Sequence, residues 1–248
     1  MTEATLRGEE RPLPRSMPVL LSFVAGYVDS YTYLGLFGLF VAQVTGSFVI
    51  AGAEFVTHDF GIAGKLLAIA AFLTAAAATA ALITLTRNAE RTALPFMLGL
   101  EALLLAAFAA IVVFGPPIKD ARDWHGIAAG MFAAMAMGAQ SVLVRLLMRD
   151  IPQTNVMTGN ITQLGIAITD IITARRRFAR SRHDAAAIAE FEHVRERLLT
   201  VLSIALGFMA GAASGAVAFA AAGLRGALLA VAIVAAIALW AAMRQERV

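Results

Sequence analysis

Residues 40–52 read FVAQVTGSFVIAG, a stretch that places a short polar group inside a strongly apolar part of the chain. A continuous membrane helix has no need of the Gln, Thr-Gly pair and Ser at its centre. A second Thr-Gly pair stands in VMTGNITQLG, residues 156–165. Helix-capping residue types beside apolar runs indicate that a short or broken helix begins at each pair, at membrane depth.

The surrounding composition is that of an integral membrane protein. Of 248 residues, 60% are hydrophobic and 15% are charged, and the mean hydropathy is +0.77. A soluble domain is about half apolar and a quarter charged. The charges are clumped, so that Asp29 is the only charged residue between 17 and 53. Apolar runs of about 20 residues between short charged loops predict an all-α, polytopic helix bundle.

Composition and motifs exclude several functions. The chain has no Cys and no cluster of His and carboxylates at ligand spacing, so we expect no disulfide, metal or cofactor. It has no Gly-x-Ser-x-Gly, His-Glu-x-x-His or Gly-x-x-x-x-Gly-Lys sequence, so we expect no enzyme. Arginines beside the spans suit anionic lipid headgroups, and we expect membrane lipid rather than nucleic acid as a partner.

Six long apolar segments follow a polar start that we interpret as a disordered cytoplasmic tail, residues 1–16. Two shorter apolar segments, 45–57 and 158–173, each begin at a Thr-Gly pair. The six long segments are 17–38, 65–86, 94–114, 126–148, 198–221 and 225–243.

The charges of the loops favour six membrane spans, with both termini in the cytoplasm of a bacterium and the spans in its inner membrane. In that topology the two short segments enter and leave on one side, and Arg87 and Arg91 lie inside. If both short segments crossed completely there would be eight spans, and these two arginines would lie outside. Only the middle loops distinguish the two topologies.

The chain repeats itself. Gly26 matches Gly138, 112 residues later, and Thr45 matches Thr158, 113 residues later. Two units follow, 17–114 and 126–243, with an Arg-rich cytoplasmic insertion at 174–197 in the second. Three spans per unit make the second unit enter the membrane from the opposite face, which is the inverted repeat of many secondary transporters. The alternatives are chance similarity of apolar segments, or parallel repeats with eight spans.

The short helices suggest a solute site. Thr45 or Ser47 would cap the first, Thr158 or Asn160 the second, and their N-termini would lie near the membrane midplane. Two such N-termini favour an anionic or polar solute, and the two glycines would let it approach the backbone. The alternative is that these small residues only pack helices. The predicted substrate-binding residues are Gln43, Thr45, Gly46, Ser47, Gln140, Thr158, Gly159 and Asn160.

Ionisable residues inside spans are functional candidates. Asp29, near the middle of the first span, is predicted to couple transport to a proton or cation, or else to pair with Arg145. Glu101, in the third span, is a second coupling candidate, or else it bonds to a neighbouring helix. Arg145 itself lies near a helix end and is expected to be structural or to reach the headgroups.

Two further features point to packing and to the membrane surface. Gly207, Gly211 and Gly215 recur every four residues and predict a close helix contact, within one chain or between two copies of a homo-oligomer. The Arg-rich stretch from Arg175 has helical periodicity and is expected to form an amphipathic helix on anionic lipid.

Several of these motifs together resemble the YoaK family of bacterial inner-membrane proteins. They are Gly26-x-x-Asp29, FVAQVTGS, Gly138-Ala139-Gln140 and NVMTGN, and the resemblance extends over about 17–243. The family usually has Thr-Gly-Asn in the first copy and Gly-Met-Gln-Asn in the second. Here Ser47 and Ser141 replace those two asparagines. The resemblance implies a polytopic membrane protein and supplies no substrate.

The sequence therefore predicts a secondary transporter of a small polar or anionic solute. A passive channel could be built from the same half-helices and would show no dependence on a pH gradient. A third alternative is a scaffold or assembly protein that does not transport and that uses the glycine ladder and the Arg-rich helix. A packed centre without a cavity would favour that alternative.

Overall fold

The computed structural model describes residues 16–57, 61–85, 90–148, 151–180 and 184–245, and all regular structure in these ranges is helical. The predicted all-α class is thereby confirmed, while the predicted tail at 1–16 lies almost entirely outside the described residues. The elements are α1 (Ser16–Gly35), α2 (Val44–Thr57), α3 (Ile62–Leu85), α4 (Glu90–Phe114), α5 (Trp124–Leu147), α6 (Met157–Arg180), α7 (Ala185–Ala222), the short 3-10 helix η3 (Gly223–Gly226) and α8 (Ala227–Gln245).

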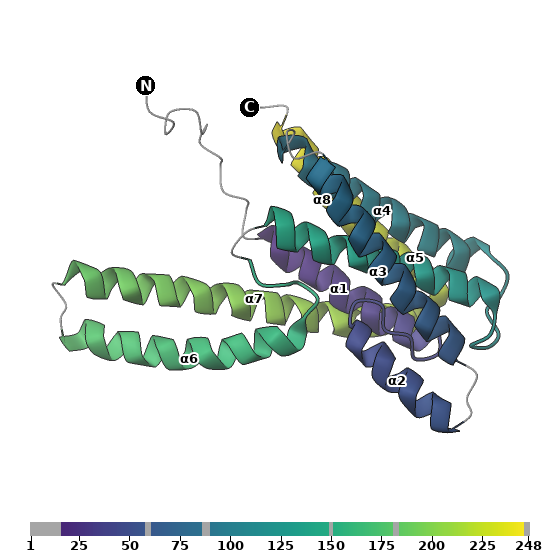
Figure 1. The fold of residues 1–248 in the computed structure, drawn as a ribbon, viewed down its shortest axis with the longest axis horizontal. Coiled ribbons are helices and arrows are strands. Elements are labelled where there is room, and N and C mark those ends of the chain that lie inside the picture. Colours follow the sequence, from purple (N-terminus) through teal and green to yellow (C-terminus); the bar gives the residue numbers. More distant parts are fainter. Residues whose placement is uncertain (1–15, 58–60, 86–89, 149–150, 181–183, 246–248) are drawn as a thin grey trace.

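The long helices form a bundle in which several neighbours in space are distant in sequence (Figure 1). α1 packs chiefly against α7, and α3 packs against α5. α4 lies between α5 and α8 and contacts both. The two helices that begin near the Thr-Gly pairs pack outside this arrangement, α2 against α3 and α6 against α7.

Local sequence explains several helix ends. Asp123 caps α5, since its side chain accepts a hydrogen bond from the His125 N–H, and Asp184 caps α7 in the same way through Ala186. α7 ends at Gly223, whose φ of 54° is readily adopted only by a residue without a side chain.

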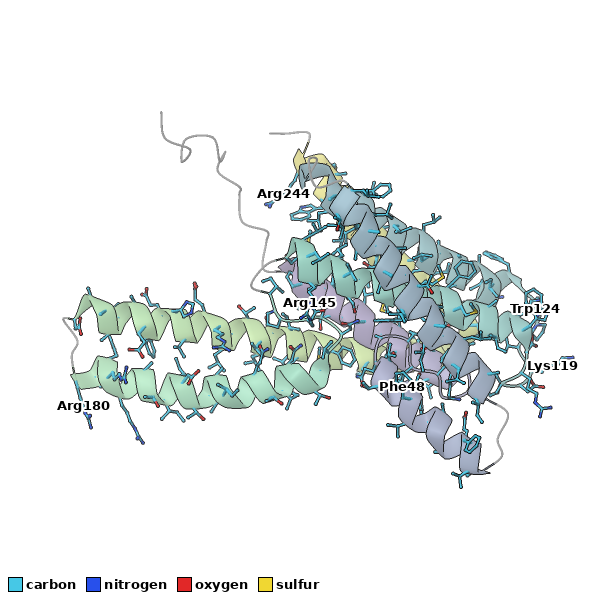
Figure 2. All side chains as sticks on the ribbon, in the orientation of Figure 1. Phe48, Lys119, Trp124, Arg145, Arg180 and Arg244 are labelled. Atoms are coloured by element: carbon cyan, nitrogen blue, oxygen red, sulfur yellow. The ribbon has the colours of Figure 1, made fainter. Side chains whose placement is uncertain are left out.

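The Arg-rich stretch differs from its prediction as a separate surface helix. Its first part is the end of α6 and its second part is the start of α7, so the two helices extend into an antiparallel hairpin. The hairpin projects away from the bundle, with Arg180 at its far end (Figures 1 and 2). Arg177 pairs with Glu190 at 3.1 Å, and the rings of Phe178 and Phe191 stack at 5.4 Å. Nothing between 190 and 205 breaks a helix, which is why α7 continues into the bundle.

The buried core consists of two apolar clusters. The larger includes Tyr31, Leu105, Phe108 and Met137, and the smaller includes Met97 together with residues near the cytoplasmic ends predicted for the spans. Most other core positions on α5 are alanine or glycine, which lets this helix approach its neighbours closely.

Four helical segments in the described part of the chain are long and apolar enough to cross a membrane. A helical membrane protein is therefore the class that the structure supports. The fourth segment comprises α7, η3 and α8, which the sequence analysis counts as two spans. α1, which contains Asp29, is not among the four. The segments are Ile62–Leu85, Ala93–Phe114, Trp124–Leu147 and Ala185–Arg244.

Candidate functional site

Asp29 holds the loop that leads into α2. One carboxylate oxygen accepts hydrogen bonds from the main-chain N–H groups of Val41 (2.8 Å) and Ala42 (2.7 Å), and the other accepts from Gln43 (3.0 Å). Asp29 is only 2% exposed. Hydrogen bonds to an ionised acceptor are about twice as strong as neutral ones, so this carboxylate fixes the loop to the middle of α1.

These donors belong to residues 41–43, which precede the first turn of α2, so Asp29 anchors the loop and does not cap the helix. α2 begins at Val44, so Thr45 and Ser47 lie inside its first turn, and the expectation that one of them is the cap is wrong. Ser47 is buried and bonds back to Phe40, donating to its carbonyl at 2.7 Å and accepting from its N–H at 3.2 Å. Thr45 is exposed.

The base of the same segment is held by a buried ion pair. Lys65, 2% exposed, donates to Glu54 Oε1 at 2.6 Å and to the carbonyl of Phe37 at 3.2 Å. Phe37 has a φ of 54°, an uncommon conformation for a residue with a side chain. The start and the end of residues 37–54 therefore meet at one side chain, whereas the middle reaches Asp29.

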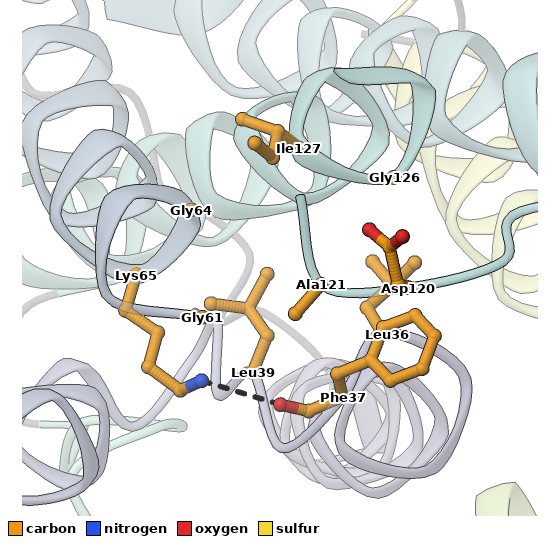
Figure 3. A pocket seen from close by; sticks show the side chains of 10 residues that line it. All are labelled: Leu36, Phe37, Leu39, Gly61, Gly64, Lys65, Asp120, Ala121, Gly126 and Ile127. Atoms are coloured by element: carbon orange, nitrogen blue, oxygen red, sulfur yellow. Dashed lines mark hydrogen bonds between the residues drawn. The ribbon is translucent and has the colours of Figure 1, made fainter. Parts of the chain in front are cut away.

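A small cavity adjoins this ion pair. Its volume is about 20 Å³, which matches one water molecule. Figure 3 shows the Lys65 ammonium group turned toward the Phe37 carbonyl, with Asp120 across the cavity. A space of this size is too small for an organic solute, and this observation taken alone favours the scaffold alternative.

The loop that leads into α6 is held by neutral groups. Gln140 of α5 donates to the Thr154 hydroxyl at 2.8 Å and to the carbonyl of Leu21 in α1 at 3.0 Å. The side-chain amide of Asn155 donates to the Ser141 hydroxyl at 2.5 Å. This loop is therefore bound from α5 at two successive positions, without a charge.

α1 binds both loops. The Ser22 hydroxyl lies 2.9 Å from the carbonyl oxygens of Thr154 and Ile204, and its single O–H donates to this pair. Ser22 and Asp29 are seven residues apart, so they share one face of α1 at about 10 Å separation. They lie on either side of the midpoint of α1, and the two loops therefore converge on the centre of this helix.

Asn160 repeats the role of Ser47. Its side-chain amide donates at 2.6 Å to the carbonyl of Gln153, seven residues earlier, just as Ser47 bonds to Phe40 seven residues earlier. α6 begins at Met157, so the expected cap at Thr158 or Asn160 is also wrong. Ser47 and Asn160 each lie in the first turn of a short helix and bond to a carbonyl in the loop before it. Neither side chain caps its helix.

The eight residues predicted to bind a solute differ in exposure. Because α2 packs on α3 and α6 on α7, the two short helices have different partners, and what they share is that the loop before each bonds to α1. The predicted residues are Ser47, Gln140 and Asn160, which are buried, Gln43, Gly46 and Gly159, which are partly buried, and Thr45 and Thr158, which are exposed.

The glycine ladder lies against α1 within the same chain. A Cβ added at Gly207, Gly211 or Gly215 would collide with main-chain carbonyl groups of α1, at Val19, Phe23 and Tyr27 respectively. In return, a Cβ at Gly26 would collide with the carbonyl of Phe208. The contact between α1 and α7 is thus a close approach of two backbones.

The other ionisable candidates stand apart from the loops. Arg145 is exposed in the last turn of α5, and the Asp29 carboxylate is occupied by the loop, so the alternative of an Asp29–Arg145 pair is wrong. Glu101 is completely buried in the middle of α4, and neither of its carboxylate oxygens has a hydrogen-bond partner among the described residues.

Ser22, Thr154 and Asn155 hold the second loop but were not among the predicted site residues, although Asn155 begins the motif NVMTGN. Asn155 lies just before the Thr-Gly pair, at the position where the first copy has Ala42, and this change from apolar to amide was the available signal. Ser22 carried none, because a single serine in an apolar helix is common. Within the ranges that the structure describes, no three His, Asp or Glu residues are arranged to hold a metal ion.

Comparison with known families matches residues 17–241 to the family described as "Protein of unknown function (DUF1275)". The match covers nearly the whole of both predicted units, and it confirms the resemblance to a family whose function is not known. No curated protein and no solved structure matches the chain.

Proposed function

The chain belongs to the DUF1275 family of proteins of unknown function, and we propose that it is a secondary transporter of a small polar solute in the bacterial inner membrane. One observation carries the proposal: the loops before α2 and α6 both bind the centre of α1, at Asp29 and Ser22. Irregular backbone at membrane depth is tolerated where it is buried in protein or lines a cavity. Secondary transporters form their solute sites from such broken helices.

We infer that the first short segment is re-entrant. Phe37 and Glu54 both contact Lys65, so the segment starts and finishes at the same level. Between them, Ala42 contacts Asp29, which lies six residues, or about 9 Å, before the end of α1 at Gly35. A segment that enters the bundle by about 9 Å and then returns to its starting level has not crossed the bilayer.

The second segment supports the same geometry. Thr154 contacts Gln140, seven residues or about 10 Å before the end of α5. α6 then runs antiparallel to α7 as far as the Arg177–Glu190 pair. It returns toward the end of the bundle where α5 finished, and this favours six spans with both termini in the cytoplasm.

Matched contacts support the inverted repeat. Gly26 of α1 approaches the α7 backbone at Phe208, and its counterpart Gly138 of α5 approaches the α3 backbone at Phe72. Since α3 and α7 are also counterparts, the first helix of each unit packs against the third helix of the other. An exchange of this kind is expected when two units are related by a two-fold axis in the membrane plane.

The chemistry of the loops favours a neutral polar solute over an anion. The N–H groups before α2, which would attract an anion, already donate to the Asp29 carboxylate. The Gln140 Oε1 and Asn155 Oδ1 atoms are buried acceptors without a partner in the described chain. A solute with hydrogen-bond donors would complement these acceptors.

The re-entrant topology can be tested directly because the chain has no Cys. T57C, K119C and R180C each introduce one thiol, and a membrane-impermeant maleimide is applied to spheroplasts and to inside-out vesicles. We expect T57C and K119C to react from the outside and R180C from the inside. If α2 and α6 cross completely, T57C will react from the same side as R180C, and the proposed site will be excluded.

Transport is tested with the purified protein in proteoliposomes. Amino acids, amines, sugars and small carboxylates are first screened for a rise in unfolding temperature, and solutes that stabilise the protein are then used in uptake assays. A secondary transporter accumulates the solute above its external concentration when a pH gradient is imposed, and an ionophore abolishes the accumulation. A channel only equilibrates the solute, and a scaffold does neither.

A further inference from the structure

Glu101 is a buried carboxyl group that the packing leaves without a partner. It is 0% exposed, it lies in the middle of α4, and both of its oxygens lack a hydrogen bond within the described residues. It is also the only charged residue among the described side chains of α4. A bare carboxylate costs several kcal/mol to bury even after relaxation of the protein, so an additional species must neutralise it.

Glu101 lies at the boundary between the two apolar clusters. Met97 and Leu98 belong to the smaller cluster and Leu105 to the larger. On α5, which packs against α4, Met137 belongs to the larger cluster and Leu143 to the smaller, so Gln140 lies at the same boundary. Ser22 of α1 likewise stands between Leu21 and Val24.

This boundary is a polar level across the middle of the bundle. Gln140 and Ser22 are the residues that bind the second loop, at Thr154. Glu101 is therefore at the level of the proposed solute site, on a helix that does not itself contact either loop through a hydrogen bond among the described residues.

The identity of the neutralising species follows from the number of available ligands. α8 has no side-chain oxygen between 227 and 243, and α4 has none between 94 and 114 except that of Glu101. On the facing part of α5 only Gln140 and Ser141 carry oxygen, and Ser141 is engaged by Asn155. A metal cation such as calcium needs about six oxygen ligands or more, whereas a proton needs one.

We propose that Glu101 is a proton-binding site in the membrane core, and that its proton is the one coupled to movement of the solute. The coupling part of this inference rests on the proposed transport function. Asp29 is less suited to the role, because its carboxylate is already engaged by three main-chain N–H groups. Glu101 has no such engagement.

Few other charges can influence Glu101. α4 packs against α5, α8 and η3. The histidine and charged groups on these three elements are His125 and Arg145 at opposite ends of α5, Arg225 in η3, and Arg244 at the end of α8, all near the ends of the bundle. α1 touches α4 where the rings of Tyr31 and Phe108 meet, seven residues or about 10 Å along α4 from Glu101.

The test is labelling with dicyclohexylcarbodiimide, an apolar reagent that reacts with protonated carboxyl groups. The full chain is purified in detergent and treated over a range of pH, and the adduct is located by peptide mass spectrometry. We expect Glu101 to be the principal site, with labelling that falls as the pH rises, by about tenfold per pH unit once the ionised form dominates. We expect Asp29 to react far less.

Two variants and a salt series make the result decisive. E101Q mimics the neutral carboxyl group, so we expect this variant to fold and to form no adduct at position 101. D29N should still form the adduct at Glu101. If E101Q does not fold, the position of the adduct in the unmodified chain still decides. An unlabelled Glu101, labelling that ignores pH, or protection by NaCl but not by choline chloride would overturn the proton site.

The labelling requires neither solute nor transport, so it separates the two proposals. An adduct with the expected pH dependence in a protein that transports nothing keeps the proton site and removes the transport function. Solute accumulation that persists in E101Q under a pH gradient keeps the transport function and overturns the coupling role.

Discussion

The main-chain N–H of Ala42 donates a 2.7 Å hydrogen bond to the carboxylate of Asp29, thirteen residues earlier in the chain. This bond joins the middle of a broken segment to the middle of α1. The residues that the predicted repeat matches to Ala42 and Asp29 are Asn155 and Ser141, and these two form a neutral bond. The two loops are thus held at matching positions by different chemistry, the first by a bond to a carboxylate of α1 and the second by a neutral bond to α5.

Replacing Asp29 by Asn should loosen the first loop. The amide keeps the shape but removes the charge, and hydrogen bonds to charged groups contribute about 1.5–3 kcal/mol. We expect D29N to lower the free energy of unfolding by about this amount. Amide hydrogen exchange at residues 41–43 should accelerate by about tenfold or more, as local opening becomes easier.

The matched control is S141A, which removes the neutral fastening of the second loop. Exchange should then accelerate around Asn155 and stay unchanged at 41–43. If D29N accelerated exchange equally in both loops, Asp29 would be a general determinant of stability rather than the anchor of the first loop.

Gly211→Ala should disrupt the contact between α1 and α7. The added methyl group would meet the Phe23 carbonyl, and overpacking of this kind costs about 1–3 kcal/mol. The control is Gly165→Ala in α6, where no atom lies within 4 Å of the added carbon. That change should be neutral or should stabilise the helix by up to about 1 kcal/mol. Unfolding in mixed micelles by added SDS measures the stability of both variants. An equal loss of stability in Gly211→Ala and Gly165→Ala would contradict the close contact between α1 and α7.

Breaking the Lys65–Glu54 pair should cost more than removing it entirely. E54Q leaves a buried ammonium group without its counter-charge, a change that typically costs about 3–5 kcal/mol. The double variant E54L/K65M removes both charges and should lose less stability than E54Q alone. The same unfolding titration compares the stability of E54Q with that of the double variant. A double variant less stable than E54Q would show that the unpaired ammonium group is not what destabilises E54Q.

Asp123 should stabilise the start of α5 in a pH-dependent way. Its pKa is lowered from the ordinary value of 3.8, first because the carboxylate accepts a hydrogen bond from the main-chain N–H of His125. A lowered pKa in the folded protein means that this stabilisation is present above pH 3.8 and is lost as the pH falls through the folded-state value. Wild type should therefore unfold at a higher temperature than D123A at neutral pH, and the difference should shrink in acid.

D123N provides the control for this pH dependence. Asn is also a good N-cap but carries no titrating charge. The unfolding temperature of D123N relative to D123A should therefore not change with pH over the acidic range. A D123N curve that followed the wild type in acid would assign the pH dependence to other groups.

The two short helices illustrate how far sequence reasoning reaches. Their approximate starts follow from the Thr-Gly pairs, because small polar residues of capping type that interrupt an apolar run favour a break in the helix at that point. The anchor of the loop before the first short helix could not be predicted, because it is Asp29 on a different helix. The length of α6 was underestimated for a similar reason, since a stretch of arginines forms regular helix once the start of α7 lies beside it.

Several residues of the candidate site were predicted from the sequence, but their contacts with one another and with the main chain were not. Asp29, Glu101 and Gln140 stand out as polar residues in apolar spans. Asp29 binds main-chain N–H groups and Gln140 binds a main-chain carbonyl as well as the Thr154 hydroxyl. Main-chain groups belong to every residue and leave no mark in a sequence, and the lack of a partner at Glu101 among the described residues is equally invisible there. Ser22 and Thr154 were missed because a hydroxyl in a helix or loop is ordinary until its neighbour is known.

By itself, the sequence determined that the chain is an all-α membrane protein and predicted two similar units, because apolar length and repeated spacing are properties of the chain alone. The tertiary structure decided which groups meet. It placed both loops on α1, packed α1 against α7 and α5 against α3, and left Glu101 buried without a partner among the described residues. These features depend on contacts between residues far apart in the chain, and the free energy of such contacts is set by packing and burial that only the folded arrangement defines.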